Sequence, residues 1–344
     1  MTRKINVAVT GMGNMGRGHA ANMTAFTDVN LKALCDANIE AALKYKEEHH
    51  LDCAVYSDFY RMIEEEELDA IYICLPPFCH SGQFEAAAKR GIAVFIEKPI
   101  ALTVARGEAM AEAAEAGGAV TQVGYQMRFG AATRRLMELI SSGEAGRPLL
   151  FTGSYECNSL HTPWWIDKEK CGGQVFEQVI HLYDLAQYIM GPVSEVSGRV
   201  ANLAHRDVPG YTVEDTSIAN LVFESGALGC ITGSNCAVKE QWNARFRVVC
   251  ENLVASFEDF NNAEITYTGA HAGNVELIRG QDPVTEMEDR HFIDAVAGRA
   301  APFATVEDGL SSLKLVAAVV ESSEKNGTVV KLQRAAQAQR CGND

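Results

Sequence analysis

The sequence lacks any hydrophobic run long enough to cross a membrane, although 47% of its 344 residues are hydrophobic. A membrane span needs roughly 18 consecutive apolar residues, and Lys314 interrupts the apolar stretch 313–320. Basic residues are also scarce: 30 Lys and Arg against 45 Asp and Glu give a formal net charge of −15. An acidic chain repels nucleic-acid phosphates and anionic lipids. We therefore expect neither a nucleic-acid nor a membrane partner.

Paired cysteine motifs are missing as well. None of the ten cysteines forms a Cys-x-x-Cys pair, the usual basis of a structural zinc site. Residues 1–5 run directly into a strand-like segment, without the charged and apolar regions of a signal peptide. Unpaired thiols are typical of reducing compartments. We therefore expect buried, reduced thiols, no metal site and a cytoplasmic protein.

The first 125 residues alternate between short apolar runs and helix-like stretches. The runs that predict strands are 5–9, 31–35, 70–75, 93–96 and 119–123, and those that predict helices are 19–26, 41–49, 81–90 and 104–116. Strands that alternate with helices form parallel, doubly wound sheets. The sequence therefore predicts an α/β domain over residues 1–125.

After residue 125 the pattern changes to neighbouring strands with few helices between them. Expected helices are 133–141, 173–190, 286–298 and 308–325, and expected strands are 149–155, 195–201, 216–223, 228–235, 245–250, 253–257 and 263–268. Runs of adjacent strands indicate an open, mostly antiparallel sheet. Residues 126–333 are thus predicted to form an α+β domain whose last helices can pack back on the first domain, and residues 334–344 a frayed tail.

Glycines 11, 13 and 16 form a G-x-G-x-x-G motif between the first expected strand and helix. Gly11 allows a tight turn, Gly13 lets backbone N–H groups approach a pyrophosphate, and Gly16 allows close helix packing. The helix N-terminus adds partial positive charge. A chance glycine turn is the alternative, but the position between strand and helix favours a dinucleotide-binding loop.

Asp36 ends the second expected strand, 20 residues after Gly16. This is the spacing of the carboxylate that binds an adenosine ribose. A 2′-phosphate about 4 Å away would cost roughly 1 to 4 kcal/mol, and the next three residues include no arginine. Helix capping is the alternative role. The sequence favours NAD over NADP.

Glu97, Lys98 and Pro99 follow the fourth expected strand. Ligands of doubly wound sheets bind at the carboxyl ends of the strands, so the charged pair is better explained by function than as a surface turn. The proline allows a cis peptide bond that would direct the lysine. We expect Lys98 at the edge of the cofactor site.

Glu177, His181 and Asp184 share one face of the expected helix 173–190. At 100° per residue, His181 lies about 40° from Glu177 around the helix axis, and Asp184 lies about 20° from Glu177 on the other side. A metal site and a salt-linked helix face are the competing interpretations. A single histidine with two carboxylates is a poor transition-metal cage. The two glycines that begin the helix, 172 and 173, favour close approach to a ligand, and hence a catalytic face.

Together these motifs resemble the Gfo/Idh/MocA family over roughly residues 4–332. The resemblance rests on the glycine loop with His19, Leu75-Pro76-Pro77 with His80, Glu97-Lys98-Pro99, residues 124–129, and the Gly-Gly segment leading to Glu177, His181 and Asp184. It implies a Rossmann domain, a C-terminal open-faced sheet that forms subunit interfaces in a dimer or tetramer, a nicotinamide cofactor, and polyol or sugar substrates.

The resemblance also implies roles for individual residues. Lys98 and His181 correspond to the catalytic lysine and histidine, and Glu177 stands where the family usually has an aspartate, which leaves its reach uncertain. Further cofactor contacts are expected from Asn14, Met15, Leu75, Pro76, His80, Glu97 and Gln126, and substrate contacts from Arg128, His161, Trp164, Trp165, Asp167 and Asp184 beside Lys98 and His181. The tryptophans could equally be core or interface anchors.

We therefore expect an NAD-dependent dehydrogenase for a secondary hydroxyl of a sugar, cyclitol or glycoside. His181 would act as general base, Lys98 would stabilise the alkoxide, and Glu177 would orient His181. One alternative is a glycoside-processing enzyme that uses tightly bound NAD for transient sugar oxidation, either a redox glycosidase or a glycoside 3-dehydrogenase. Another is a sensor without catalysis.

Overall fold

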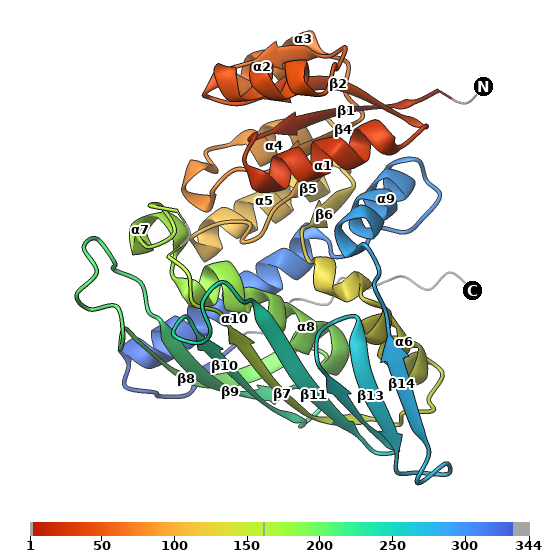
Figure 1. Cartoon of the computed structure of the whole chain (residues 1–344), viewed down its shortest axis with the longest axis vertical. Coiled ribbons are helices and arrows are strands. Elements are labelled where there is room, and N and C mark those ends of the chain that lie inside the picture. The colour runs from red at the N-terminus through yellow and green to blue at the C-terminus, as the bar shows by residue number, and fades with distance from the viewer. Residues whose placement is uncertain (1–2, 161, 333–344) are drawn as a thin grey trace.

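The computed structural model describes residues 3–160 and 162–332, which form two sheets with helices packed between and around them (Figure 1). The first sheet is parallel, in the order β3-β2-β1-β4-β5-β6. Its strands are β1 (Ile5–Thr10), β2 (Val29–Cys35), β3 (Ala54–Tyr56), β4 (Ala70–Ile73), β5 (Ala93–Ile96) and β6 (Thr121–Val123). The predicted α/β class is confirmed.

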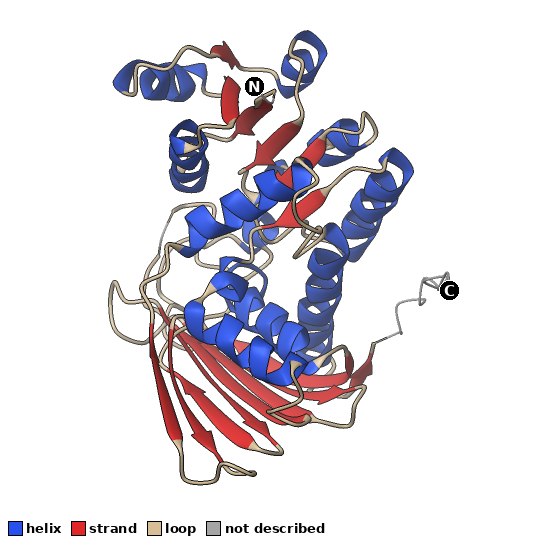
Figure 2. Ribbon diagram, turned by 90° about the vertical axis from the view of Figure 1, so that its right-hand side faces the viewer, coloured by secondary structure: helices blue, strands red, loops and turns tan. Residues whose placement is uncertain are grey.

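Helices cover both faces of this sheet (Figure 2). They are α1 (Asn14–Ala25), α2 (Ile39–Glu48), α3 (Phe59–Glu65), α4 (Gln83–Ala88) and α5 (Val104–Gly117). Every residue of β4 and β5 is buried, which explains their continuous apolar sequence. Strand β3 and helix α3 were not predicted, because a three-residue strand and a seven-residue helix leave little periodic signal.

The second sheet has the order β14-β13-β12-β11-β7-β10-β9-β8-β15. Within this sheet, only β7 and β10 pair in parallel among the described strands, so the predicted open, mostly antiparallel sheet is confirmed. The strands are β7 (Pro148–Glu156), β8 (Val193–Ala201), β9 (Thr216–Phe223), β10 (Leu228–Ser234), β11 (Asn243–Cys250), β12 (Leu253–Phe257), β13 (Asn262–Tyr267), β14 (Val275–Arg279) and β15 (Val330–Lys331).

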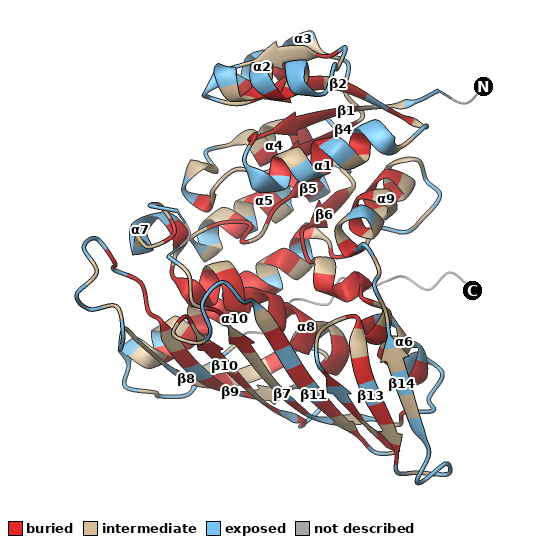
Figure 3. Ribbon diagram, in the orientation of Figure 1, coloured by how far each residue is buried: buried red, intermediate tan, exposed pale blue. Residues whose placement is uncertain are grey.

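One face of the second sheet is covered by helices and the other is open (Figure 2). Burial alternates along β9 and β11 (Figure 3), as expected for a sheet packed on one side. The remaining helices are α6 (Ala131–Ser141), α7 (Lys168–Cys171), α8 (Ile180–Met190), α9 (Val284–Val296) and α10 (Val306–Glu324). Helix α10 packs on both β8 and α5, and α9 on α1, so the C-terminal helices join the two sheets.

The predicted helix 173–190 is two different helices in the structure. A π-helical turn, Val175–Val179, precedes α8, so the angular spacing assumed from an α-helix does not hold between Glu177 and His181. π turns insert one residue per turn and occur frequently at functional sites. None of the helices in the described ranges is long and apolar enough to cross a membrane.

Candidate active site

The glycine loop folds tightly against the end of β4. Gly11 has φ +90°, and a Cβ there would lie 2.5 Å from the Cys74 carbonyl oxygen, while a Cβ on Gly16 would lie 1.8 Å from the Gly11 oxygen. A Cβ on Gly13 would meet nothing within 4 Å. The outer side of the loop is therefore open where backbone N–H groups and the N-terminus of α1 can receive a pyrophosphate. The loop fits a dinucleotide.

Asp36 lies beside this loop. Its Oδ2 accepts a hydrogen bond from the Met12 N–H at 2.7 Å, and its Oδ1 accepts one from the Asn38 N–H at 2.8 Å. The carboxylate thus stands at the carboxyl end of β2, beside the glycine loop. Leu75 and Pro76 follow β4, which is separated from β2 by β1. Asn14 and Met15 begin α1 and are exposed, and Gln126 begins the short helix η2 (Gln126–Phe129).

Lys98 reaches from the Rossmann sheet to the π turn. The peptide bond between Lys98 and Pro99 is cis. Lys98 Nζ donates to the Glu177 carbonyl oxygen at 2.5 Å and to Glu177 Oε1 at 2.8 Å. The second carboxylate oxygen of Glu177 accepts from the indole N–H of Trp165 at 2.6 Å. Both side chains of the ion pair are about 15% exposed, so the pair is largely shielded from water.

His181 lies in the first turn of α8 and is buried. Its ring centroid is 6.2 Å from that of Tyr125, edge to face, and 6.5 Å from that of Tyr155, nearly parallel. Burial, reinforced by the positive charge of Lys98, lowers the pKa of His181 well below its usual value. Its Nδ1 has no hydrogen-bond partner in the described part of the chain. The imidazole is therefore neutral at pH 7 and able to accept a proton.

The predicted role of Glu177 as the partner of His181 is wrong. No hydrogen bond joins them, because the π turn directs the carboxylate of Glu177 to Lys98 and Trp165. Glu177 therefore holds the lysine rather than the histidine. The extra methylene relative to the family's usual aspartate lengthens this reach.

Two expected cofactor-binding residues, Glu97 and His80, make hydrogen bonds within the protein. Glu97 is buried, and its Oε1 pairs with His19 while its Oε2 accepts from the Lys98 backbone N–H. His80 contacts the carbonyl oxygens of Leu75 and Ile100 with its two ring nitrogens. These contacts hold the loops at the edge of the sheet, and a cofactor contact by either residue stays a prediction.

Arg128 and Asp184 form a buried bidentate ion pair, at 2.8 and 2.6 Å. Burial raises the pKa of Asp184, and the guanidinium opposes that shift. Arg128 lines a cavity of about 560 Å³ near α9 that Lys98, Glu177 and His181 do not line. The two side chains engage each other, and a substrate contact by either of them stays a prediction.

The segment before α7 carries the remaining expected substrate residues. Asp167 caps α7 by accepting from the Glu169 N–H and forms an ion pair with Lys170, so its carboxylate is already engaged. Trp165 is buried and supports Glu177, whereas Trp164 is partly buried, 6.4 Å from the ring of Phe78. His161 lies outside the described residues.

Three neighbours of the catalytic groups were not predicted as site residues. Tyr125 and Tyr155 enclose the ring of His181, and Glu214 accepts from the Val175 N–H at 2.8 Å. Tyr125 belongs to residues 124–129, one of the segments that carry the family resemblance, but Tyr155 and Glu214 lie on distant segments. Only the tertiary structure brings them to this place.

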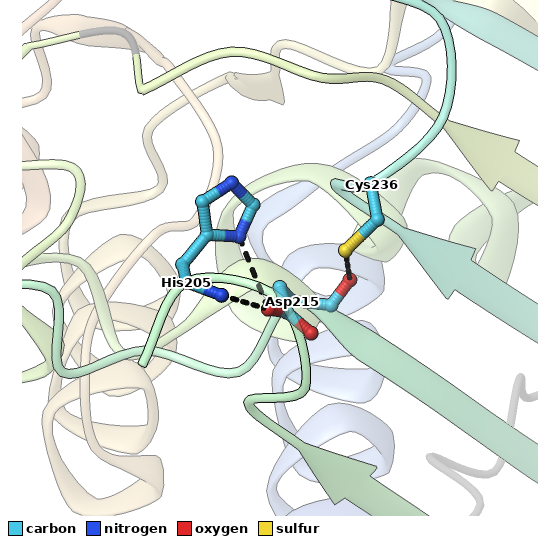
Figure 4. Close-up of side chains that lie close together, drawn as sticks. All are labelled: His205, Asp215 and Cys236. Atoms are coloured by element: carbon cyan, nitrogen blue, oxygen red, sulfur yellow. Dashed lines mark hydrogen bonds and ion pairs between the residues drawn. The ribbon is translucent and has the colours of Figure 1, made fainter. Parts of the chain in front are cut away.

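His205, Asp215 and Cys236 bring ligand-type atoms within 4.8 Å of one another (Figure 4). Burial opposes ionisation of Asp215, but N–H donors, chiefly those of residues 203–205, lower its pKa to about 2. His205 Nδ1 occupies the same carboxylate at 3.0 Å, and burial raises the pKa of the Cys236 thiol. Asp215 thus accepts several hydrogen bonds from N–H groups of residues 203–205, and these bonds hold the loop before β9 in place.

The fold, the glycine loop and the Lys98–His181 pair define a dinucleotide-dependent oxidoreductase. Residues 5–125 match the model of an oxidoreductase family with an NAD-binding Rossmann fold, and residues 133–255 match the GFO/IDH/MocA C-terminal domain. The chain therefore belongs to the Gfo/Idh/MocA oxidoreductase family, and its first domain binds NAD, as the sequence predicted.

Named relatives cover nearly the whole chain. Myo-inositol 2-dehydrogenase of Thermotoga maritima is 28% identical over 94% of this chain and 98% of its own. D-glucoside 3-dehydrogenase of Escherichia coli is 26% identical over 95% and 97%. Among solved structures, levoglucosan dehydrogenase in complex with NADH and levoglucosan superposes with a TM-score of 0.88 at 21% identity, over 96% of this chain and 100% of that one.

Proposed function

We propose that this protein oxidises a secondary hydroxyl of a sugar, cyclitol or glycoside and transfers the hydride to NAD. The observation that carries the proposal is the placement of a neutral, buried His181 beside a charged Lys98 at the carboxyl edge of an NAD-binding sheet. Alcohol oxidation needs a proton acceptor and a cation at one oxygen atom. These two side chains supply both.

His181 accepts the hydroxyl proton. It is neutral before the reaction, and burial between Tyr125 and Tyr155 keeps water from protonating it. As the proton leaves, Lys98 donates a hydrogen bond to the developing alkoxide, which stabilises the negative charge in a site of low polarity. Glu177 and Trp165 keep Nζ in place. Bound NAD supplies the hydride acceptor.

The substrate class is inferred from the relatives and from the site together. The relatives above are named for an inositol, a glucoside and levoglucosan, which are all polyhydroxylated rings. Trp164, on the segment that leads to Trp165, offers an aromatic face suited to a sugar ring. We propose that this segment forms the substrate side of the site.

A rate screen with inositols, aldoses and glycosides tests this function. We expect NADH to accumulate with at least one of them, faster with NAD than with NADP. Release of a free aglycone without net NADH would instead identify the redox glycosidase. Tight NAD binding with no reaction of any alcohol would identify the sensor.

We further propose that the enzyme is a cytoplasmic homo-oligomer. Within each chain, the boundary between the two domains lies near residue 125. The nine cysteines within the described residues are all free, which agrees with a reducing compartment. Leu228 pairs in register with Leu150 and Val222 on the open face of the second sheet, and Leu228 is 55% exposed. An exposed apolar row of this kind is suited to a subunit interface.

A further inference from the structure

Behind the cofactor edge lies a histidine that the proposed mechanism does not use. His19 is fully buried in α1, three residues after the last glycine of the loop. Its Nδ1 is 2.7 Å from Asp289 Oδ1 of α9, and its Nε2 is 3.1 Å from Glu97 Oε1. The ring therefore contacts three separate parts of the chain: the cofactor helix, the C-terminal helix α9 and the residue before Lys98.

We propose that His19, held by Asp289, is a positioning residue that keeps Lys98 in its reactive place by holding the carboxylate of Glu97. The inference rests on the proposed role of Lys98. It assigns to the histidine no contact with substrate or cofactor.

The geometry requires a doubly protonated ring. Both partners of His19 are carboxylate oxygens, which only accept hydrogen bonds when ionised, and a neutral imidazole has a single N–H to donate. An imidazolium donates to both. Burial would lower the pKa of His19, but the carboxylates of Asp289 and Glu97 raise it to about 10. The ring thus lies between two carboxyl groups and bonds to one with each nitrogen.

Glu97 transmits this constraint to Lys98. Its Oε2 accepts from the Lys98 backbone N–H at 3.3 Å, and its own N–H donates to the Ile73 carbonyl oxygen at 3.0 Å. Gly124 makes room for this carboxylate, because a Cβ there would lie 2.8 Å from Glu97 Oε2. Glu177 holds the other end of the lysine. Lys98 is therefore fixed at both its backbone and its ammonium group.

Other titratable groups face the same cluster. Glu288 of α9 is buried and its pKa is raised well above the usual value by burial and by Glu97. Burial likewise raises the pKa values of Tyr72 and Cys74. Each of these shifts favours the uncharged form of its group, and the two carboxylates that bond to the ring of His19 are those of Asp289 and Glu97. Asn22 donates to Asp289 Oδ2 at 2.7 Å and fixes its orientation.

The test compares His19→Gln with Phe292→Leu. Phe292 packs against Tyr72 and Phe95 in the same cluster but carries no polar group, so its variant controls for lost packing. We expect His19→Gln to lower kcat roughly 10-fold to 100-fold, because small displacements of a catalytic group are costly. NADH affinity should change less than 3-fold. Phe292→Leu should lower Tm and leave kcat within 2-fold.

Two further measurements test the role of His19 without measuring enzyme turnover. Nitrogen-15 NMR should show both His19 nitrogens protonated at pH 8, with the signal assigned by its loss in His19→Gln. Acetic anhydride should acetylate Lys98 several-fold faster in His19→Gln than in Phe292→Leu, as read by mass spectrometry. If His19→Gln does not fold, Asp289→Asn replaces it, with the same direction expected for Lys98 acetylation.

A neutral His19 at pH 8 would overturn the inference. So would unchanged Lys98 acetylation, or a kcat that falls with Tm alike in both variants. Failure of the wild-type enzyme on every polyol would instead count against the proposed function, and the NMR and acetylation results would still decide the role of His19.

Discussion

His181 is buried, and the charge of Lys98 acts on its imidazole. Burial and the Lys98 ammonium group lower the pKa of His181, so the base is ready at neutral pH. Glu177 pairs with the lysine, and Nδ1 of His181 has no hydrogen-bond partner among the described residues. The residue-scale predictions therefore concern proton acceptance and cofactor choice.

His181→Ala should lower kcat/KM at least 100-fold, which is the usual range for loss of a general base. NADH binding, followed by fluorescence, should stay within 3-fold. The pKa of His181 is lowered from the ordinary histidine value of 6.5, so the imidazole stays unprotonated as the pH falls to 6.5. The acid limb of kcat/KM in the wild type should therefore lie below pH 6.5. His271→Ala, at an exposed histidine, is the control. An acid limb at pH 7 or above would contradict this account.

Asp36→Ser should reduce the preference for NAD over NADP by at least 10-fold, measured as the ratio of the two kcat/KM values. The substitution removes both the ribose acceptor and the charge that repels a 2′-phosphate, an effect of roughly 1 to 4 kcal/mol. Asp52→Ser, at an exposed aspartate, should leave the ratio unchanged. An equal ratio in both variants would show that Asp36 does not select the cofactor.

At the residue scale, the sequence predicts which side chains carry chemistry better than it predicts which side chains contact one another. The glycine loop, Asp36 and Lys98 were predictable because each role follows from a local motif. Glu97 was placed with the cofactor ligands, but its partner His19 is 78 positions away in sequence. Local patterns do not reveal such long-range pairs, and the same reason explains the missed ion pair of Arg128 and Asp184.

At the scale of elements, the π turn Val175–Val179 is the feature that decides how the site is arranged. Gly173 precedes it with φ +114°, and a Cβ there would lie 2.4 Å from Glu214 Oε2. Glu214 accepts the N–H of Val175, the first residue of the turn. Close packing of this glycine on a buried carboxylate therefore sets where the turn begins, and with it the direction of Glu177.

Gly173→Ala should destabilise the protein and lower kcat, and Gly143→Ala is its matched control. Both glycines have positive φ, but a Cβ on Gly143 would meet nothing within 4 Å. Each variant bears the strain of a left-handed backbone, roughly 1 to 2 kcal/mol, and Gly173→Ala adds overpacking of about 1 to 3 kcal/mol. Denaturant unfolding measures the difference. Equal losses in the two variants would exclude the proposed role of Glu214.

Most elements were predictable from the sequence, and each exception has its own cause. The strands of the Rossmann sheet and most of the second sheet carry apolar runs or alternation. Strand β14 was not predicted: it is a five-residue strand at the sheet edge with no buried residue, and its apolar residues Val275 and Leu277 are exposed. The π turn was missed because hydrophobic periodicity over one turn does not separate π from α geometry.

The whole molecule joins an NAD-binding sheet to a broad open sheet through α9 and α10 (Figure 1). Leu228→Glu should weaken the proposed oligomer, because it places a charge in the apolar row that includes Leu150. Leu203→Glu, at a residue that is 56% exposed outside the sheet, is the control. Light scattering after size-exclusion chromatography gives the masses. A wild-type monomer, or equal dissociation in both variants, would refute this interface.

Protonation of His19 should also be visible in the stability of the whole protein. Its pKa is about 10 when folded and near 6.5 when unfolded. The folded state therefore binds more protons between these values, so this stabilisation is complete below pH 6.5 and declines as the pH rises toward 10. Urea unfolding at pH 7 and pH 9.5 should show a loss that is smaller in His19→Gln. An identical loss in His19→Gln would argue against a charged His19.

The central claim is that a hydride leaves a carbinol carbon of the substrate for NAD while His181 takes the hydroxyl proton. The most direct measurement follows deuterium from a polyol labelled at that carbon, using whichever inositol, aldose or glycoside the rate screen identifies. The account predicts deuterium in the reduced cofactor, a primary isotope effect on kcat/KM, and loss of transfer in His181→Ala. Deuterium that never reaches the cofactor, or transfer that continues unchanged in His181→Ala, would contradict it.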